Sequence, residues 1–234
     1  MISPEKKLHR FFIPHIPETA SLELTDPKLV HHVRTVLRYE NGESFIIFAA
    51  GGNDIVVTIT GISKKSISVS VIRTIPARPH PARDVIAAIS IIKRDLFELV
   101  VQKLTELGVT AVVPVRSDRT IKQSVRIDRL EMIAIEAMEQ SGGNVPVRIY
   151  EPMILQDCLA AFPYPSVVCD PRTTGIFEGE QKVVMYIGPE GGWSPADLDT
   201  FEHHGTYTMT LGPTILRTET AAIVGAYELM RTPQ

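Results

Sequence analysis

The segment "PARPHPAR", residues 76–83, divides the chain into two parts with different hydrophobic patterns. It holds three prolines in eight residues, which neither a helix nor a strand accommodates in its interior, so we predict a linker. Short segments rich in Ile, Val, Thr and Phe dominate before it, whereas strand-like and helix-like segments alternate after it. The sequence therefore predicts two domains, residues 1–75 and residues 76–234.

The first part has the pattern of a small β-barrel. Strands are predicted for "ESFIIFAA", "NDIVVTIT" and "KSISVSVIR", and "SISVSVI" alternates with the period of two expected of a half-buried strand. One helix is predicted for "KLVHHVRTVLR", because Asp26 and Pro27 before it are typical of a helix start. Short antiparallel strands with one helix predict a compact barrel.

The second part has the pattern of an α/β domain. "DVIAAISII" is apolar throughout, as in a strand of a sheet that is covered on both faces. The helix "RDLFELVVQKLTELG" follows, with Gly108 at its end. Further strands are predicted for "VTAVVPV", "VRIYEP", "SVVCD", "KVVMYI" and "YTMTL", and further helices for "RLEMIAIEAMEQS", "LQDCLAAF", "PADLDTFEHH" and "ETAAIVGAYELM". This alternation predicts a mostly parallel sheet.

The charge distribution is compatible with a nucleic-acid partner, although the net charge of −3, taken alone, argues weakly against one. Residues 1–149 carry 20 Lys and Arg against 16 Asp and Glu, a net charge of +4, whereas residues 150–234 carry 4 against 11, a net charge of −7. This asymmetry is compatible with a basic face on an acidic protein, and ordinary solvated charge is the alternative.

The compartment follows from the cysteines and from the absence of long apolar runs. Cys158 and Cys169 are the only cysteines, too few for a disulfide framework in 234 residues. No apolar run approaches the roughly 20 residues that span a bilayer, and the first residues lack the apolar stretch of a secretory signal. We expect a cytoplasmic protein that is not bound to a membrane.

Three strand ends in the last third of the chain predict a ligand pocket. They are "SVVCDPRTTG", "KVVMYIGPEGGW" and "YTMTLGPTILRTETA". Ligands of open α/β sheets bind at the carboxyl ends of the strands, and a glycine turn lets a ligand approach the backbone closely. A plain strand-to-helix turn is the alternative for "GPEGG" alone, but three such loops together favour a binding site.

Several common ligands are not expected here. "GPEGG" is not followed by the Gly-Lys-Ser/Thr of an ATP-binding phosphate loop, so we do not expect ATP as a ligand. It also lacks the Gly-x-Gly-x-x-Gly pattern of a dinucleotide site, so we do not expect NAD. Neither HExxH nor CxxC is present, and we predict no metal site. Cys169 has no sequence context of a nucleophile, so we expect an inert thiol.

Four motifs carry a resemblance to a known family. "QKLTELGV", "AMEQSG", "IGPEGGWS" and "LGPTILRTETA", in this order and spacing, resemble the ribosomal RNA small-subunit methyltransferase E family, and "HRFFIP" and "HHVRTVLRYENGE" fit its PUA-like RNA-binding module. The resemblance covers essentially the whole chain. It implies an S-adenosylmethionine-dependent enzyme that methylates N3 of a uridine in 16S ribosomal RNA. It also implies the SPOUT fold, with a trefoil knot near the C-terminus, and a homodimer with the site near the subunit interface.

The resemblance also implies which residues hold the methyl donor. They lie in the three strand-end loops and are Cys169, Asp170, Ile187, Gly188, Pro189, Glu190, Gly191, Gly192, Leu211, Gly212, Ile215, Leu216, Arg217, Thr218 and Thr220.

Catalytic and RNA-binding residues are expected near these loops. Arg217 is the candidate for stabilising the uridine anion, with a purely structural pairing to Glu219 or Glu190 as the alternative. The general base is Glu139 or Glu219, and the sequence does not choose between them. Basic residues expected to contact RNA, each with an ordinary surface role as the alternative, are Arg10, Arg34, Arg38, Lys93, Arg94, Arg116 and Arg119.

Two positions depart from the family pattern. Gly143 and Thr214 stand where the family usually has arginine, which puts the details of RNA contact in doubt unless Arg148 or Arg116 substitutes. Two other functions remain open: a non-catalytic RNA-binding assembly factor, and a SPOUT enzyme acting on transfer RNA. The intact glycine loop argues against the first, and the PUA-like part and "EQSG" favour ribosomal RNA over the second.

Overall fold

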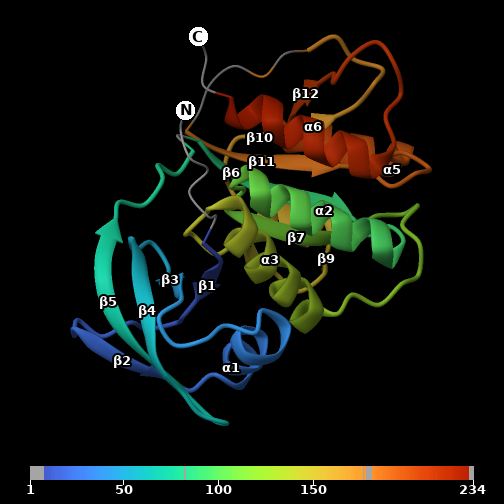
Figure 1. Ribbon diagram of the computed structural model, residues 1–234. Coiled ribbons are helices and arrows are strands. Elements are labelled where there is room, and N and C mark those ends of the chain that lie inside the picture. Colours follow the sequence, from blue (N-terminus) through green and yellow to red (C-terminus); the bar gives the residue numbers. More distant parts are fainter. Residues whose placement is uncertain (1–7, 82, 176, 178–180, 232–234) are drawn as a thin grey trace. The chain divides into compact units, whose positions relative to one another are not determined.

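The computed structural model describes residues 8–81, 83–175, 177 and 181–231 (Figure 1). The chain forms two compact units, which are described separately. The first unit comprises Met1–Pro79 and Met138–Val145, and the second comprises His80–Ala137 and Pro146–Gln234. The segment 138–145, which the sequence assigned to the second domain, therefore packs with the first unit.

The first unit is built on a five-stranded sheet with the order β1-β3-β4-β5-β2. The strands are β1 (Arg10–Phe12), β2 (Ser21–Leu24), β3 (Ser44–Phe48), β4 (Asp54–Ile62) and β5 (Ile67–Ile75). The sequence predicted antiparallel strands only, but the sheet is mixed, because β1 runs parallel to β3. Phe45, Ile47 and Ile67 are fully buried in its core. The sequence missed β2, since only Leu24 of its four residues is buried.

The helix predicted for 28–38 forms in two pieces. The side chain of Asp26 caps α1 (Pro27–His31) by accepting a hydrogen bond from the backbone N–H of Leu29. A π-helical turn, η1 (His32–Val36), follows, and the N–H of Leu37 donates to the carbonyl of His32. Arg38 then adopts a φ of 55°, which is uncommon for a residue with a side chain.

The second unit has a parallel sheet, as the sequence predicted. Its order is β12-β10-β11-β6-β7-β8, and β9 also pairs with β7. The strands are β6 (Asp84–Ser90), β7 (Ala111–Arg116), β8 (Arg148–Ile149), β9 (Met153–Ile154), β10 (Ser166–Cys169), β11 (Lys182–Ile187) and β12 (Tyr207–Met209). Of the strand predicted for 147–152 only β8 forms, and β9, directly after Pro152, was not predicted.

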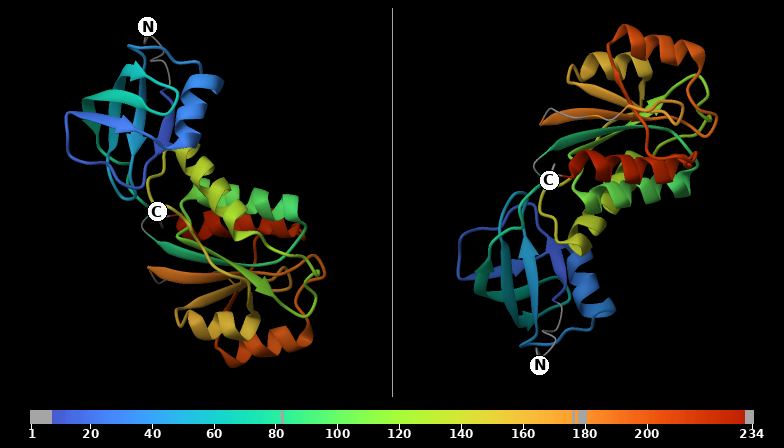
Figure 2. Two further views of the ribbon diagram at one scale, coloured as in Figure 1. Left: turned by 90° about the horizontal axis from the view of Figure 1, so that it is seen from below. Right: turned by 90° about the horizontal axis from the view of Figure 1, so that it is seen from above.

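Helices cover both faces of this sheet (Figure 2). On one face α2 (Arg94–Leu107), the beginning of α3 (Ile127–Ser141) and α6 (Thr218–Met230) pack against Val85, Ala87 and Ile89 of β6. On the other, α4 (Leu155–Ala161) and α5 (Pro195–His203) pack against Ile86 and Ala88. The continuous apolar run of β6 is thus explained by burial on both faces. None of the described helices is long and apolar enough to cross a membrane.

Candidate functional site

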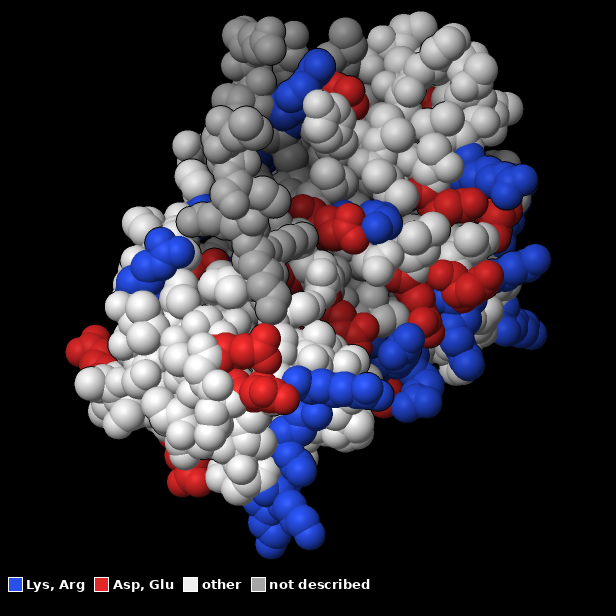
Figure 3. Space-filling model, viewed as in Figure 1, with Lys and Arg blue, Asp and Glu red and all other residues white. Residues whose placement is uncertain are grey.

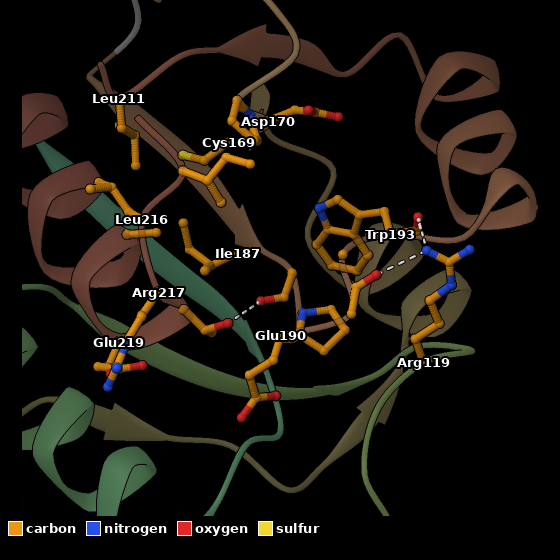
Figure 4. A pocket seen from close by; sticks show the side chains of 18 of the residues that line it. Arg119, Cys169, Asp170, Ile187, Glu190, Trp193, Leu211, Leu216, Arg217 and Glu219 are labelled. Atoms are coloured by element: carbon orange, nitrogen blue, oxygen red, sulfur yellow. Dashed lines mark hydrogen bonds between the residues drawn. The ribbon is translucent and has the colours of Figure 1, made fainter. Parts of the chain in front are cut away.

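A pocket of about 660 Å³ lies at the carboxyl edge of the parallel sheet in the second unit (Figure 4). Cys169 at the end of β10 is in register with Ile187 of β11 and Met209 of β12, so the three strands end at one level. The loops after them line the pocket, as the sequence predicted. Of the residues expected to hold the methyl donor, all line it except Gly212 and Thr220.

The glycine loop after β11 is a tight turn fixed at both ends. The N–H of Gly192 donates to the carbonyl of Pro189 at 2.8 Å, and Gly192 has a φ of 68°. A Cβ at Gly188 would approach the ring of Trp193 to 3.1 Å, so glycine lets the loop and this ring pack closely. The Thr218 hydroxyl, at the start of α6, donates to the carbonyl of Gly188 at 3.0 Å. This bond joins the second and third loops of the pocket.

Ser194 ends the loop and is the N-cap residue of α5. Its hydroxyl accepts from the backbone N–H of Asp197 while the Asp197 carboxylate accepts from the N–H of Ser194, a capping box. The Ser194 hydroxyl also donates to Asp118 at 2.7 Å. Trp193 beside it is buried against Phe201, with ring centroids 4.9 Å apart.

Arg119 holds the glycine loop from the segment that follows β7. Its Nη1 donates to the carbonyl of Gly191 at 2.9 Å and to that of Trp193 at 3.3 Å (Figure 4). Arg119 was expected to contact RNA, but in the structure two backbone carbonyls occupy this side-chain nitrogen. These two hydrogen bonds tie Arg119 to the glycine loop.

Asp170 and Arg172 form an ion pair at the pocket. Asp170 is buried at the end of β10, and Arg172 Nε donates to its Oδ1 at 2.9 Å. This hydrogen bond holds the pKa of the Asp170 carboxyl below its usual range. Sequence reasoning missed Arg172, which also lines the pocket, although its position two residues after a strand-end aspartate was a usable signal.

The thiol of Cys169 is not set up for nucleophilic chemistry. It lines the pocket wall, and burial raises its pKa to about 12. A neutral thiol is a poor nucleophile, so the residue acts as a small apolar side chain, in line with the sequence-based expectation.

The charged residues of the pocket include one basic and two acidic side chains with catalytic potential. Arg217, Glu190 and Glu219 all line the cavity. Arg217 is exposed at the residue before α6, and among the described residues no ion pair joins it to either glutamate. Its guanidinium is therefore available to a ligand.

Glu139, the other candidate base, lies in the first unit. Its carboxylate accepts a hydrogen bond from the backbone N–H of Phe12 at 2.8 Å. It does not line the pocket. Its contact gives Glu139 a structural role in joining α3 to β1.

Arg10 was expected to contact RNA, and in the structure its side chain is enclosed by partners of the first unit. Its guanidinium pairs with Asp54 at 2.7 Å and lies over the ring of Phe48, 4.1 Å from the centroid. It also donates to three carbonyls, those of Met138, Glu139 and Gly143. Only 11% of the side chain is exposed, because these acceptors and the ring enclose it.

The other basic candidates are exposed. Arg34 donates one long hydrogen bond, 3.4 Å, to the carbonyl of Lys64, and Arg116 donates one of 3.5 Å to that of Pro152. The side chains of Arg38, Lys93 and Arg94 have no hydrogen-bond or ion-pair partner among the residues that the structure describes. Lys93 lines the pocket, and so does Thr214, one of the two positions that depart from the family pattern.

Two family models match the chain. That of an RNA methyltransferase domain matches residues 78–229, and that of an RNA methyltransferase PUA domain matches residues 24–72. Over 227 residues the chain is 30% identical to the ribosomal RNA small subunit methyltransferase E of Mesomycoplasma hyopneumoniae (strain 232), a match that covers 92% of this chain and 96% of the relative.

Solved structures agree with these matches. A putative methyltransferase of Legionella pneumophila, in complex with the bound cofactor SAM, has a TM-score of 0.87 at 27% identity, covering 96% of this chain and 97% of that one. A ribosomal RNA small subunit methyltransferase E of Neisseria gonorrhoeae, bound to S-adenosyl methionine, has a TM-score of 0.86 at 27% identity, covering 94% and 95%.

Proposed function

This chain belongs to the ribosomal RNA small subunit methyltransferase E family, and from that premise we propose that it methylates N3 of a uridine in 16S ribosomal RNA with S-adenosylmethionine as the donor. The observation that carries the proposal is the 660 Å³ pocket made by three strand-end loops at the carboxyl edge of the sheet. Its volume lies in the range of pockets that bind small molecules, roughly 300 to 1,000 Å³.

The residues of the pocket fit this donor. The indole N–H of Trp193 is buried without an acceptor among the described residues, and a bound ligand can supply one. A Cβ at Gly192 would meet no atom of the protein within 4 Å, which leaves the loop backbone open to a ligand. Leu96, Ile187 and Leu216 offer apolar walls for a nucleoside.

The donor supplies an electrophilic methyl group on a sulfonium centre. The protein's part is to prepare the acceptor, because the N3–H of uracil is a weak acid that must lose its proton before N3 can attack. We assign this proton to the carboxylate of Glu219, which lines the pocket, whereas Glu139 is engaged with Phe12. Arg217 then stabilises the negative charge that develops on the uracil ring.

We also propose a trefoil knot and a homodimer for the second unit. After β12 at the edge of the sheet, the chain returns to its middle, where α6 packs against β6 and β11. The hydrogen bond from Thr218 to Gly188 lies on this return path, which supports threading of the last segment. Ile215 is 85% exposed and Tyr227 52%, and these apolar side chains support a second subunit as their cover.

RNA binding is assigned to the exposed basic residues of the first unit. Arg34 and Arg38 are exposed on and beside η1, and phosphate contacts from them would position the RNA without reading its sequence. Because the target base is stacked or paired in mature RNA, we expect it to be flipped into the site. Both cysteines are free thiols, which supports the cytoplasm as the compartment.

A methyl-transfer assay tests this function. The full chain is incubated with S-adenosylmethionine labelled in its methyl group and, in separate reactions, with free 16S ribosomal RNA, assembled small subunits or transfer RNA from a strain lacking the enzyme. Label in 16S ribosomal RNA, free or assembled, is the expected result. Label only in transfer RNA would favour the other SPOUT activity, and no label despite RNA binding would favour an assembly factor.

A further inference from the structure

A second cavity, of about 150 Å³, lies in the second unit beside the start of α2. Its floor is apolar and buried, formed by side chains such as Ile91, Phe97 and Leu130. Its rim carries the side chains of Arg94, Arg126 and Arg129. None of the residues that line it lines the first pocket, so it is a separate site.

The segment between β6 and α2 contributes residues to both cavities. Lys93 lines the first pocket, and Arg94, the next residue, lines the second cavity. Both follow β6, at the carboxyl edge of the sheet where the proposed donor site lies. Adjacent residues of one segment thus line the two cavities.

The rim has an excess of positive charge. Arg129 pairs with Glu98, which also lines the cavity, with Nε and Oε2 3.4 Å apart. Arg126 pairs with Asp128 at 2.6 Å. The guanidinium of Arg94 has neither an ion pair nor a hydrogen bond among the described residues, which leaves its five N–H donors for a ligand. Figure 3 shows Lys and Arg side chains, with Asp and Glu side chains among them, on the edge where Figure 1 draws the start of α2 and the loop leading to α3.

We infer that this cavity binds one nucleotide of the substrate RNA, with its base on the apolar floor and its phosphate at Arg94. The inference rests on the proposed function, because it names RNA as the ligand. An apolar floor suits the flat face of a base, and a guanidinium suits the phosphate. The side-chain amide of Gln123, also in the lining, can both donate to and accept from a base edge. An inorganic anion alone would make no favourable contact with the apolar floor.

Charge-neutral variants of Arg94 test the phosphate contact. Affinity of the full chain for a fluorescein-labelled 16S ribosomal RNA fragment is measured by fluorescence anisotropy without donor, over a series of salt concentrations. Arg94→Gln is expected to weaken binding about fivefold and to lower the slope of log K against log salt by about one, as loss of one phosphate contact does. Lys103→Gln is the matched control, since Lys103 lies on the same helix outside the cavity and pairs with Glu106. It should change neither quantity.

Gln123→Ala tests the base contact independently. It is expected to weaken binding by a similar factor with the salt slope unchanged, because no charge is lost. Arg94→Gln with the affinity and salt slope of the wild type would overturn the inference. A changed sedimentation coefficient in Arg94→Gln would also overturn it, because the cavity would then belong to a subunit interface. A wild-type chain that does not bind the RNA at all would instead count against the proposed function.

Discussion

The guanidinium of Arg10 is enclosed by acceptors, whereas that of Arg217 lines an open pocket. Arg10 reaches the Asp54 carboxylate and three backbone carbonyls within the first unit. Arg217 is exposed, and no ion pair engages it among the described residues. A buried, fully hydrogen-bonded arginine stabilises the fold, while an exposed one in a pocket can act on a ligand.

Removing Arg10 should therefore destabilise the protein. Arg10→Ala leaves the Asp54 carboxylate, 19% exposed, without its partner, and breaking such a pair costs about 3 kcal/mol. Urea denaturation measures the change in the free energy of unfolding. Arg34→Ala is the control and should stay within about 0.5 kcal/mol of the wild type. Equal stability of the two variants would contradict the structural role of Arg10.

Removing Arg217 should act on turnover instead. Arg217→Ala is expected to lower kcat about a hundredfold or more, because the charge it stabilises exists only in the transition state. Calorimetry should show nearly unchanged affinity for S-adenosylmethionine, and the melting temperature should not move. Arg217→Lys should restore part of the activity, since lysine lacks the planar fork. Loss of donor affinity or of the fold in Arg217→Ala would make the residue structural.

At the scale of elements, local patterns predicted much of what the structure has. Hydrophobic periodicity is a local signal, so β6, α2 and the strand-end loops were predictable, and parallel strands bring such loops together. Contacts between residues far apart in the sequence leave no local periodicity from which they could be predicted. The segment 138–145 joins the first unit through bonds such as Arg10 to Gly143 and Gly51 to Asn144, and the bond from Arg119 to Gly191 spans 72 residues.

Arg119 offers a test of how the glycine loop is held. Arg119→Ala removes the donor to Gly191 and Trp193 carbonyls, which frees the loop and should weaken donor binding about tenfold. Calorimetry with S-adenosylmethionine measures this change. Arg116→Ala removes the same charge at the last residue of β7, and this variant should bind the donor normally. If both variants bind RNA less well while donor affinity is unchanged, Arg119 contacts RNA and does not hold the loop.

At the scale of the whole molecule, the proposed dimer explains apolar surface that one chain leaves uncovered. Ile215 and Tyr227 both belong to the segment from the third loop to α6. Neither the subunit contact nor the knot follows from hydrophobic periodicity, because both depend on how the chain meets itself or a second copy. The dimer and the knot were predicted from the family resemblance and remain predictions.

Light scattering on the full chain tests the dimer. The expected mass is twice that of the 25.9 kDa chain, and Tyr227→Glu should shift it towards the monomer by burying a charge in the interface. Ile72→Glu, at a residue 58% exposed in the first unit, is the control and should leave the mass unchanged. A wild-type monomer at micromolar concentration would contradict the proposal.

The chemistry itself is tested most directly by identifying the methylated nucleoside. 16S ribosomal RNA from a strain lacking the enzyme is incubated with the protein and S-adenosylmethionine carrying a deuterated methyl group, digested to nucleosides and analysed by mass spectrometry. The proposed activity predicts deuterated 3-methyluridine at one position, formed by the wild type and reduced about a hundredfold or more in Arg217→Ala. A methyl group on ribose or on another base, or full activity in the variant, would contradict it.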